Sequence, residues 1–91
     1  VRPFDDETEA LRSANYSRFG LAAAVMSKDL PRAERVARKL RAGIVWINCS
    51  QPTFTEAPWG GYKQSGNGRE QGVYGLEDFT EIKAVLGYAA V

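Results

Sequence analysis

Hydrophobic residues recur at helical spacing in two stretches of the chain, and each stretch follows a helix-capping residue. The run Asp6–Glu9 has the spacing of a capping box, which predicts a helix that reaches about Asn15. A second helix is expected to begin after Asp29, with Pro31 in its first turn and Gly43 just past its end. The residues expected to form its buried stripe are Leu30, Ala33, Val36, Ala37 and Leu40.

Two short apolar runs lie on either side of the second helix. Leu21–Met26 follows Gly20 and is uniformly apolar, which favours a strand buried on both faces. Ile44–Ile47 is expected to be the next strand, and Val1–Phe4 reads as the tail of an earlier one. This alternation of strands and helices predicts an α/β layer, in which right-handed crossovers join parallel strands.

The pattern becomes irregular after the strand that ends at Ile47. The segment Asn48–Lys63 contains two prolines and a Gly-Gly pair, which cannot continue a strand or a helix. A glycine-interrupted helix is expected from Gly68–Glu70 to about Phe79. From Thr80 to Tyr88 the apolar residues alternate, as they do in an exposed strand.

The loop over residues 48–63 is the segment most suited to a binding role, since loops just past strand ends often carry binding residues. Its conspicuous side chains are Phe54 and Trp59. Composition alone favours packing of both rings back onto the core, because that is what most loop aromatics do. A ligand site is the alternative.

Composition restricts the classes of function. The 91 residues suffice for one small domain, and 44% hydrophobic with 25% charged residues is ordinary for a globular chain. A net charge of +1 favours neither nucleic acid nor a membrane as partner. One cysteine and no histidine leave no internal disulfide and no zinc site. With no apolar stretch approaching ~20 residues, the chain is expected to be soluble and intracellular.

Two features invite a chemical interpretation that the rest of the sequence does not support. Cys49 is the only cysteine, but the chain has no histidine to activate it and Pro52 follows too soon for a helix to begin there, so a structural role is favoured. The second helix carries a run of basic residues with Glu34 among them, which favours a solvated face over a nucleic-acid surface. These basic residues are Arg32, Arg35, Arg38, Lys39 and Arg41.

Four short motifs follow one another along the chain. They are Phe19–Ala23, the Cys-Ser-Gln-Pro-x-Phe sequence from Cys49, the Ala-Pro-Trp-Gly-Gly sequence from Ala57, and Gln64–Glu70. In order and spacing they resemble the C-terminal part of the NAD(P)-dependent aldehyde dehydrogenases. The two loop motifs are most similar to the plant-type aminoaldehyde (betaine aldehyde) dehydrogenases. The likeness covers about residues 4–85.

The resemblance implies a binding role for four residues. In similar enzymes the positions of Trp59 and Phe54 line the aldehyde entry tunnel, where a tryptophan face attracts an ammonium group. Thr53 stands where plant relatives commonly carry cysteine, which makes the wall slightly more polar. Ile44 matches a position behind the tryptophan, where a large residue pushes the indole into the tunnel and disfavours a trimethylammonium head. An ordinary core role for Ile44 is an equally good interpretation.

The resemblance also implies how the chemistry is divided along a longer protein. The family oxidises aldehydes by thiol attack, hydride transfer to NAD and hydrolysis. The nucleophile, the base, the oxyanion-hole asparagine and the cofactor fold would all lie upstream of Val1. The chain is therefore expected to be a C-terminal fragment of a cytoplasmic or organellar enzyme, for instance of peroxisome or plastid. By itself it is expected neither to catalyse the reaction nor to bind NAD.

The expected contribution of the chain is tunnel wall and subunit contacts. Residues 1–79 would belong to the catalytic α/β domain, and residues 80–91 would form the terminal strand of an oligomerisation sheet. The implied partners are the rest of the aldehyde dehydrogenase chain, further copies in a homo-oligomer, and the aldehyde substrate. A stand-alone α/β interaction module without enzymatic activity is the alternative, since an exposed terminal strand can add to another sheet.

Overall fold

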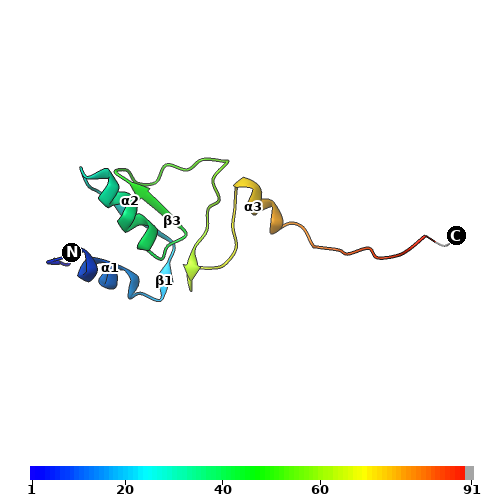
Figure 1. Ribbon diagram of the computed structural model, residues 1–91, viewed down its shortest axis with the longest axis horizontal. Coiled ribbons are helices and arrows are strands. Elements are labelled where there is room, and N and C mark those ends of the chain that lie inside the picture. The colour runs from blue at the N-terminus through cyan, green and yellow to red at the C-terminus, as the bar shows by residue number, and fades with distance from the viewer. Residues whose placement is uncertain (90–91) are drawn as a thin grey trace.

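The computed structural model describes residues 1–89, which form helices and two small sheets (Figure 1). The elements in chain order are α1 (Glu7–Asn15), β1 (Phe19–Gly20), β2 (Ala22–Val25), α2 (Leu30–Lys39), β3 (Ile44–Ile47), β4 (Tyr62–Lys63) and α3 (Gly72–Glu77). Strands β2 and β3 pair in parallel, while β1 and β4 pair antiparallel. This mixture of helices and strands confirms the α/β expectation.

Helix α1 begins where its capping residues predict. The Asp6 carboxylate accepts a hydrogen bond from the Glu9 backbone N–H at 2.7 Å, and the helix runs to Asn15 as expected. The reciprocal bond of the capping box is shifted by one residue, because the Glu9 carboxylate accepts from the backbone N–H of Asp5 at 3.0 Å. The cap therefore fixes two backbone N–H groups that the helix itself cannot satisfy.

Helix α2 also begins as predicted, with the Asp29 carboxylate accepting from the Arg32 backbone N–H at 3.0 Å. Of its expected buried stripe, Ala33 is fully buried and Val36, Ala37 and Leu40 are half-buried. The prediction that Leu30 is buried is wrong, since its side chain is 55% exposed. Leu30 is the first residue of the helix, beyond the reach of the two short strands that α2 packs on.

Strands β2 and β3 form the predicted parallel pair, with Ala22 opposite Ile44 and Val25 opposite Ile47, and α2 is the crossover between them. The expectation that residues 21–26 are buried on both faces is wrong within this chain. Exposed and half-buried residues alternate along β2, and Leu21 and Met26 are 46% and 70% exposed. Helix α2 packs on both strands, so one face has a helical cover. The first residues, 1–4, form no strand.

The second half of the chain contains pairings that the sequence pattern did not predict. Strand β4 returns to pair with β1, and Trp59 forms an isolated antiparallel bridge with Glu70. Helix α3 is shorter than expected at both ends. The helical pattern cannot extend back toward Gly68, because Gln71 and Gly72 have φ values of 63° and 61°, outside the helical range.

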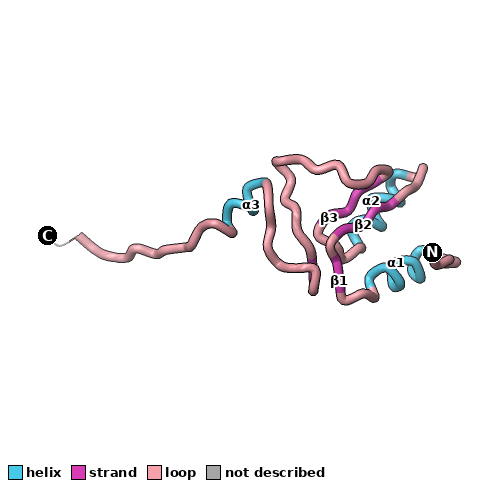
Figure 2. The backbone as a smooth tube through the Cα atoms, turned by 180° about the vertical axis from the view of Figure 1, so that it is seen from behind, coloured by secondary structure: helices cyan, strands magenta, loops and turns pink. Residues whose placement is uncertain are grey.

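The residues after α3 extend away from the folded part of the chain. Residues 80–89 form no strand, and Figure 2 shows this segment running alone beyond α3. A strand needs a partner for its backbone hydrogen bonds, so a single chain leaves the expected oligomerisation strand without one. That strand stays a prediction, and the last two of its residues, 90–91, lie outside the described residues.

The folded part leaves most of its apolar surface uncovered. With the extended tail included, the radius of gyration is 18.7 Å, against about 12 Å for a compact domain of this length. Among residues 1–89, Ala33 is the only hydrophobic side chain classed as buried, while Phe4, Phe54 and Leu76 are each at least 60% exposed. The layer seen in Figures 1 and 2 is therefore one side of a core, with little packed on the other side.

Candidate functional site

A cavity of about 210 Å³ lies between β3 and the loop that follows it. It brings together all four residues that the sequence analysis proposed for substrate binding: Ile44, Thr53, Phe54 and Trp59. The remaining lining residues are Val45, Trp46, Pro52, Ala57 and Gln71. We call this space the tryptophan cavity.

The floor of the tryptophan cavity comes from strand β3. Ile44 and Trp46 are two residues apart, so their side chains leave the same face of the strand. The indole N–H of Trp46 donates a hydrogen bond to the carbonyl oxygen of Pro52 at 2.9 Å, which holds the start of the loop against the strand. The sequence analysis missed Trp46, although the alternation along β3 starting from Ile44 could have identified it.

Trp59 forms a wall of the cavity next to Trp46. The centroids of the two rings are 5.9 Å apart and their planes are tilted by 33°, within the range of favourable aromatic pairs. The backbone of Trp59 exchanges two hydrogen bonds with Glu70, at 2.8 and 2.7 Å. The half-buried indole is therefore fixed both through its ring and through its backbone.

The backbone beyond Trp59 lies directly against the start of β3. A Cβ atom on Gly43 would overlap the carbonyl oxygen of Gly60, so only glycine permits this approach. The guanidinium of Arg69 donates to the carbonyl oxygens of Gly61 and Gly68, at 2.9 and 2.8 Å. These contacts close the loop around the cavity.

The lining of the tryptophan cavity is apolar and uncharged. Thr53 and Gln71 are its only polar side chains, and none of the nine lining residues is acidic or basic. Phe54 is 63% exposed, so the cavity is open on the side where that ring lies. An organic cation would be attracted here by the faces of the aromatic rings, not by an ion pair.

The described residues offer no catalytic constellation at the cavity. Cys49 is exposed and is not among the lining residues. Within residues 1–89 no three acidic, cysteine or histidine side chains gather to hold a metal ion. In the same described range no helix is long and apolar enough to cross a bilayer. The cavity has room for a small organic group, and its lining side chains include no cysteine, histidine or carboxylate.

The perturbed titratable groups lie away from the tryptophan cavity, between α1 and α2. Arg35 donates two hydrogen bonds to the Glu7 carboxylate, at 3.1 and 2.9 Å, and these lower the pKa of Glu7. The same contact raises the pKa of Arg35. Arg32 lies 3.4 Å from this carboxylate and adds to the attraction. This cluster ties two helices together and has no part in the cavity.

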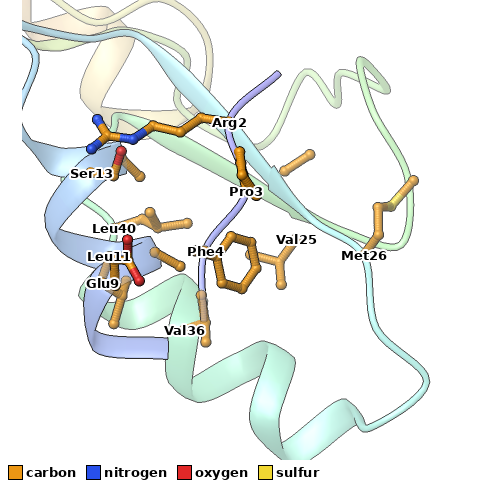
Figure 3. A pocket seen from close by; sticks show the side chains of 13 residues that line it. Arg2, Pro3, Phe4, Glu9, Leu11, Ser13, Val25, Met26, Val36 and Leu40 are labelled. Atoms are coloured by element: carbon orange, nitrogen blue, oxygen red, sulfur yellow. The ribbon is translucent and has the colours of Figure 1, made fainter. Parts of the chain in front are cut away.

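A larger cavity, of about 500 Å³, opens between the N-terminal segment, α1, α2 and β2. Figure 3 shows Phe4 beside Val25, with Leu11, Val36 and Leu40 on the helices around them. None of the four residues proposed for substrate binding lines it. Its walls are the apolar faces of two helices and a strand that do not close on one another, which makes it a packing gap and a poor candidate for a site.

The sequence profile of the aldehyde dehydrogenase family matches residues 1–85. Similar proteins include an aminoaldehyde dehydrogenase 2, peroxisomal, of Malus domestica, which is 58% identical over 99% of this chain and 18% of its own length. A betaine aldehyde dehydrogenase, chloroplastic, of Beta vulgaris is 56% identical over 93% of this chain and 17% of its own length. The chain thus spans less than a fifth of these relatives.

A solved structure shares the fold. Betaine aldehyde dehydrogenase from Staphylococcus aureus in complex with NAD+ superimposes with a TM-score of 0.81 and 59% sequence identity. The match covers 84% of this chain and 15% of the bacterial one. The similarity at both levels confirms the resemblance that the motifs carry.

Proposed function

The chain belongs to the aldehyde dehydrogenase family, and we propose that it forms one wall of the aldehyde tunnel in a longer enzyme that oxidises aminoaldehydes or betaine aldehyde. The single observation that carries this role is the tryptophan cavity, which Trp59, Phe54, Thr53 and Ile44 line together. The names of the plant relatives support the substrate class. Those of known location are peroxisomal or chloroplastic, which supports an organelle of that kind for the longer enzyme.

Cation binding in the tunnel is attributed to the two indoles. Both Trp46 and Trp59 line an uncharged cavity, and the face of an indole attracts an ammonium group by about 0.5–2 kcal/mol. An aminoaldehyde carries that group at the end opposite the aldehyde. The indoles would therefore hold the cationic end of the substrate and direct the carbonyl group away from this chain.

NAD supplies the hydride acceptor in enzymes of this family, and the solved relative contains it. The residues present here do not fit this cofactor. The glycines nearest to a phosphate-binding turn are Gly66 and Gly68, but a Cβ on Gly68 would lie 3.0 Å from a carboxylate oxygen of Asp78. The same carboxylate accepts from the backbone N–H of Arg69 at 2.9 Å. A negative charge at this position opposes a pyrophosphate, so NAD would be held by chain outside these residues.

Ile44 is proposed to select among the substrates. It lines the cavity together with Trp59, and it is a large residue at the start of β3. Its bulk behind the indole would narrow the space for the cationic end. A trimethylammonium head is larger than a primary ammonium group, so crowding penalises it selectively. The complete enzyme is expected to prefer aminopropanal and aminobutanal over betaine aldehyde.

The test measures kcat/KM for aminobutanal and betaine aldehyde in the complete enzyme and in its Ile44→Ala variant. The wild type should favour aminobutanal, and the variant should gain activity toward betaine aldehyde by about 10-fold, the scale of a difference of one to a few methyl groups. Ile47→Ala, the same truncation at the other end of β3 in a residue that does not line the cavity, is the matched control. Equal preference in the wild type, or the same gain in both variants, would sink the selective role of Ile44.

A second candidate function is assembly. The tail over residues 80–89 is unpaired, and its Ile82, Leu86 and Tyr88 are each more than 90% exposed. An apolar extended segment of this kind suits a strand shared between copies of the protein, as in a homo-oligomer. A stand-alone module and a longer enzyme differ in the intact mass of the natural protein, which is near 10.0 kDa only for the module.

A further inference from the structure

We propose that Gln71 is a specificity-determining residue of the tryptophan cavity, whose side-chain amide oxygen accepts a hydrogen bond from a primary ammonium group. This inference rests on the proposed function, because it concerns how the cationic end of an aminoaldehyde is held. It adds a directional contact to the attraction of the two indoles, which act on any cation.

The position of Gln71 is fixed by its two neighbours. Glu70 exchanges two backbone hydrogen bonds with Trp59, and the backbone N–H of Gly72 donates to the carbonyl oxygen of Thr55 at 2.8 Å. Both partners belong to the loop that closes the cavity, so Gln71 lies between two points attached to it. The backbone at Gly72 also lies directly against the loop, since a Cβ atom there would approach the Glu56 carbonyl oxygen to 2.8 Å.

The backbone of Gln71 is held in an uncommon conformation. Its φ is 63° and its ψ is 168°, a combination that is almost confined to glycine. The hydrogen bonds on either side impose this conformation, since they keep residues 70 and 72 on the loop. The side chain is thus attached just before the first residue of α3, and it lines the cavity.

The amide of Gln71 is available to a ligand. Although Gln71 precedes α3, its side chain makes no capping hydrogen bond. In residues 1–89 the side chain has no other hydrogen-bonding partner either. The other polar lining residue, Thr53, offers only a hydroxyl oxygen. Gln71 is thus the one lining side chain that offers a carbonyl oxygen to a positive group.

A hydrogen-bond acceptor and a crowded wall discriminate differently along a methylation series. A primary ammonium has three N–H donors, a dimethylammonium has one, and a trimethylammonium has none. The hydrogen bond to Gln71 should survive until the third methyl group is added, which removes the last donor. Crowding by Ile44 should instead grow with each methyl group. The change in kcat/KM between the dimethylammonium and the trimethylammonium substrate therefore measures the contribution of Gln71.

The matched variants are Gln71→Leu and Gln51→Leu in the complete enzyme. Gln51 is also a glutamine with a positive φ, 73°, in the same loop region, but it does not line the cavity. Gln71→Leu should lower kcat/KM for aminobutanal by about 10-fold, the scale of one hydrogen bond to a charged group, and leave the trimethylammonium substrate unchanged. Gln51→Leu should leave the preference for aminobutanal over the trimethylammonium substrate unchanged. A Gln71→Asn variant, which keeps the amide, should recover part of the loss.

A binding measurement separates this inference from the proposed function. Calorimetry with n-butylammonium and with butyltrimethylammonium probes the cavity without turnover. If the enzyme oxidises no aminoaldehyde, the proposed function fails, and the ratio of the two binding constants still decides the role of Gln71. The inference is supported if Gln71→Leu removes the preference for n-butylammonium. It is overturned if the preference is unchanged in that variant or absent from the wild type.

Discussion

Residues 6–47 and residues 48–79 are held together by different kinds of interaction. In the first region each helix begins at a carboxylate that accepts from a backbone N–H three residues away, and α2 joins two adjacent parallel strands. In the second region the contacts link residues 11 to 17 positions apart, such as Trp59 with Glu70 and Thr55 with Gly72. The helix starts of the first region are specified by local caps, and its strands are paired through a strand–helix–strand unit that the sequence pattern predicts. The second region is held by backbone hydrogen bonds between loop segments that no sequence pattern specifies.

This difference separates scaffold from site. Residues 6–47 fold into α1, α2 and the parallel strands. Strand β3 of this scaffold carries Ile44 and Trp46, which line the cavity. The loop then adds Trp59 and Gln71 from the other side through a small number of backbone hydrogen bonds. Substitutions in the loop contacts should therefore change ligand binding while the scaffold remains folded.

The largest effect is expected when the 91 residues are separated from the rest of the proposed enzyme. Produced alone, the chain should oxidise no aldehyde and bind no NAD, because the tryptophan cavity has neither a nucleophile nor a charged lining group. A steady-state assay with NAD and aminobutanal, together with calorimetry for NAD, measures both quantities. Turnover that disappears in a Cys49→Ser variant would instead make Cys49 a nucleophile.

A smaller effect should distinguish the loop from the scaffold. In Gly43→Val the added side chain collides with the Gly60 carbonyl, so the loop must leave β3 at a cost of about 3 kcal/mol, the upper end of overpacking penalties. The helix content should stay the same by circular dichroism. Fluorescence should report greater solvent exposure, because Trp46 and Trp59 are the only tryptophans of the chain.

The control for this substitution is Gly87→Val, since no heavy atom lies within 4 Å of a Cβ at that position. It should leave fluorescence and helix content unchanged. The comparison between the two regions would break down if Gly43→Val unfolded α1 and α2 as well. It would also break down if acrylamide quenched the tryptophan fluorescence of the variant no more than that of the wild type.

The sequence predicted the local parts of the fold well and the long-range parts poorly. Capping residues identified the starts of both long helices, because an N-cap and its partner are three positions apart. The predicted end of the second helix just before Gly43 was wrong, since α2 ends at Lys39 with Leu40 as its C-cap. No such rule pairs β1 with β4, or Trp59 with Glu70, since those partners are set by how the loop folds back. Helix α3 begins late because Glu70 is paired with Trp59. The residues around Gln71 contain no pattern that predicts this bridge.

The candidate site divides in the same way. Trp59, Phe54, Thr53 and Ile44 were proposed from their resemblance to known enzymes, and the fold does gather them around one cavity. Trp46 could have been added from the alternation of β3. Gln71 could not, because it reaches the cavity only through the hydrogen bonds of its neighbours with the loop. Periodicity can identify the lining residues that lie on β3, and the resemblance identified those of the loop. Neither of them indicates a residue such as Gln71, whose place at the cavity depends on the hydrogen bonds of its neighbours.

The smallest effect concerns the ion pair that joins α1 to α2 in the first region. Arg35 lowers the pKa of Glu7, so the carboxylate is favoured more strongly in the folded chain than in the unfolded one. The resulting stabilisation is present above the ordinary pKa of 4.5 and is lost as the pH falls below it, when Glu7 takes up a proton. Glu7→Gln should thus lower the melting temperature near pH 7 and lower it less near pH 3, where protonation of Glu7 has begun to remove the contribution.

The shift should be small, about a degree or two, because exposed ion pairs contribute little and salt screens them. Glu34→Gln, which removes an acid on α2 that makes no ion pair among the described residues, is the matched control and should show no pH-dependent difference. Thermal unfolding at pH 3 and pH 7, with and without 0.5 M salt, measures both variants. An equal shift at both pH values would mean that Glu7 acts through packing or helix propensity. In that case the two helices of the scaffold would be joined by their apolar faces alone.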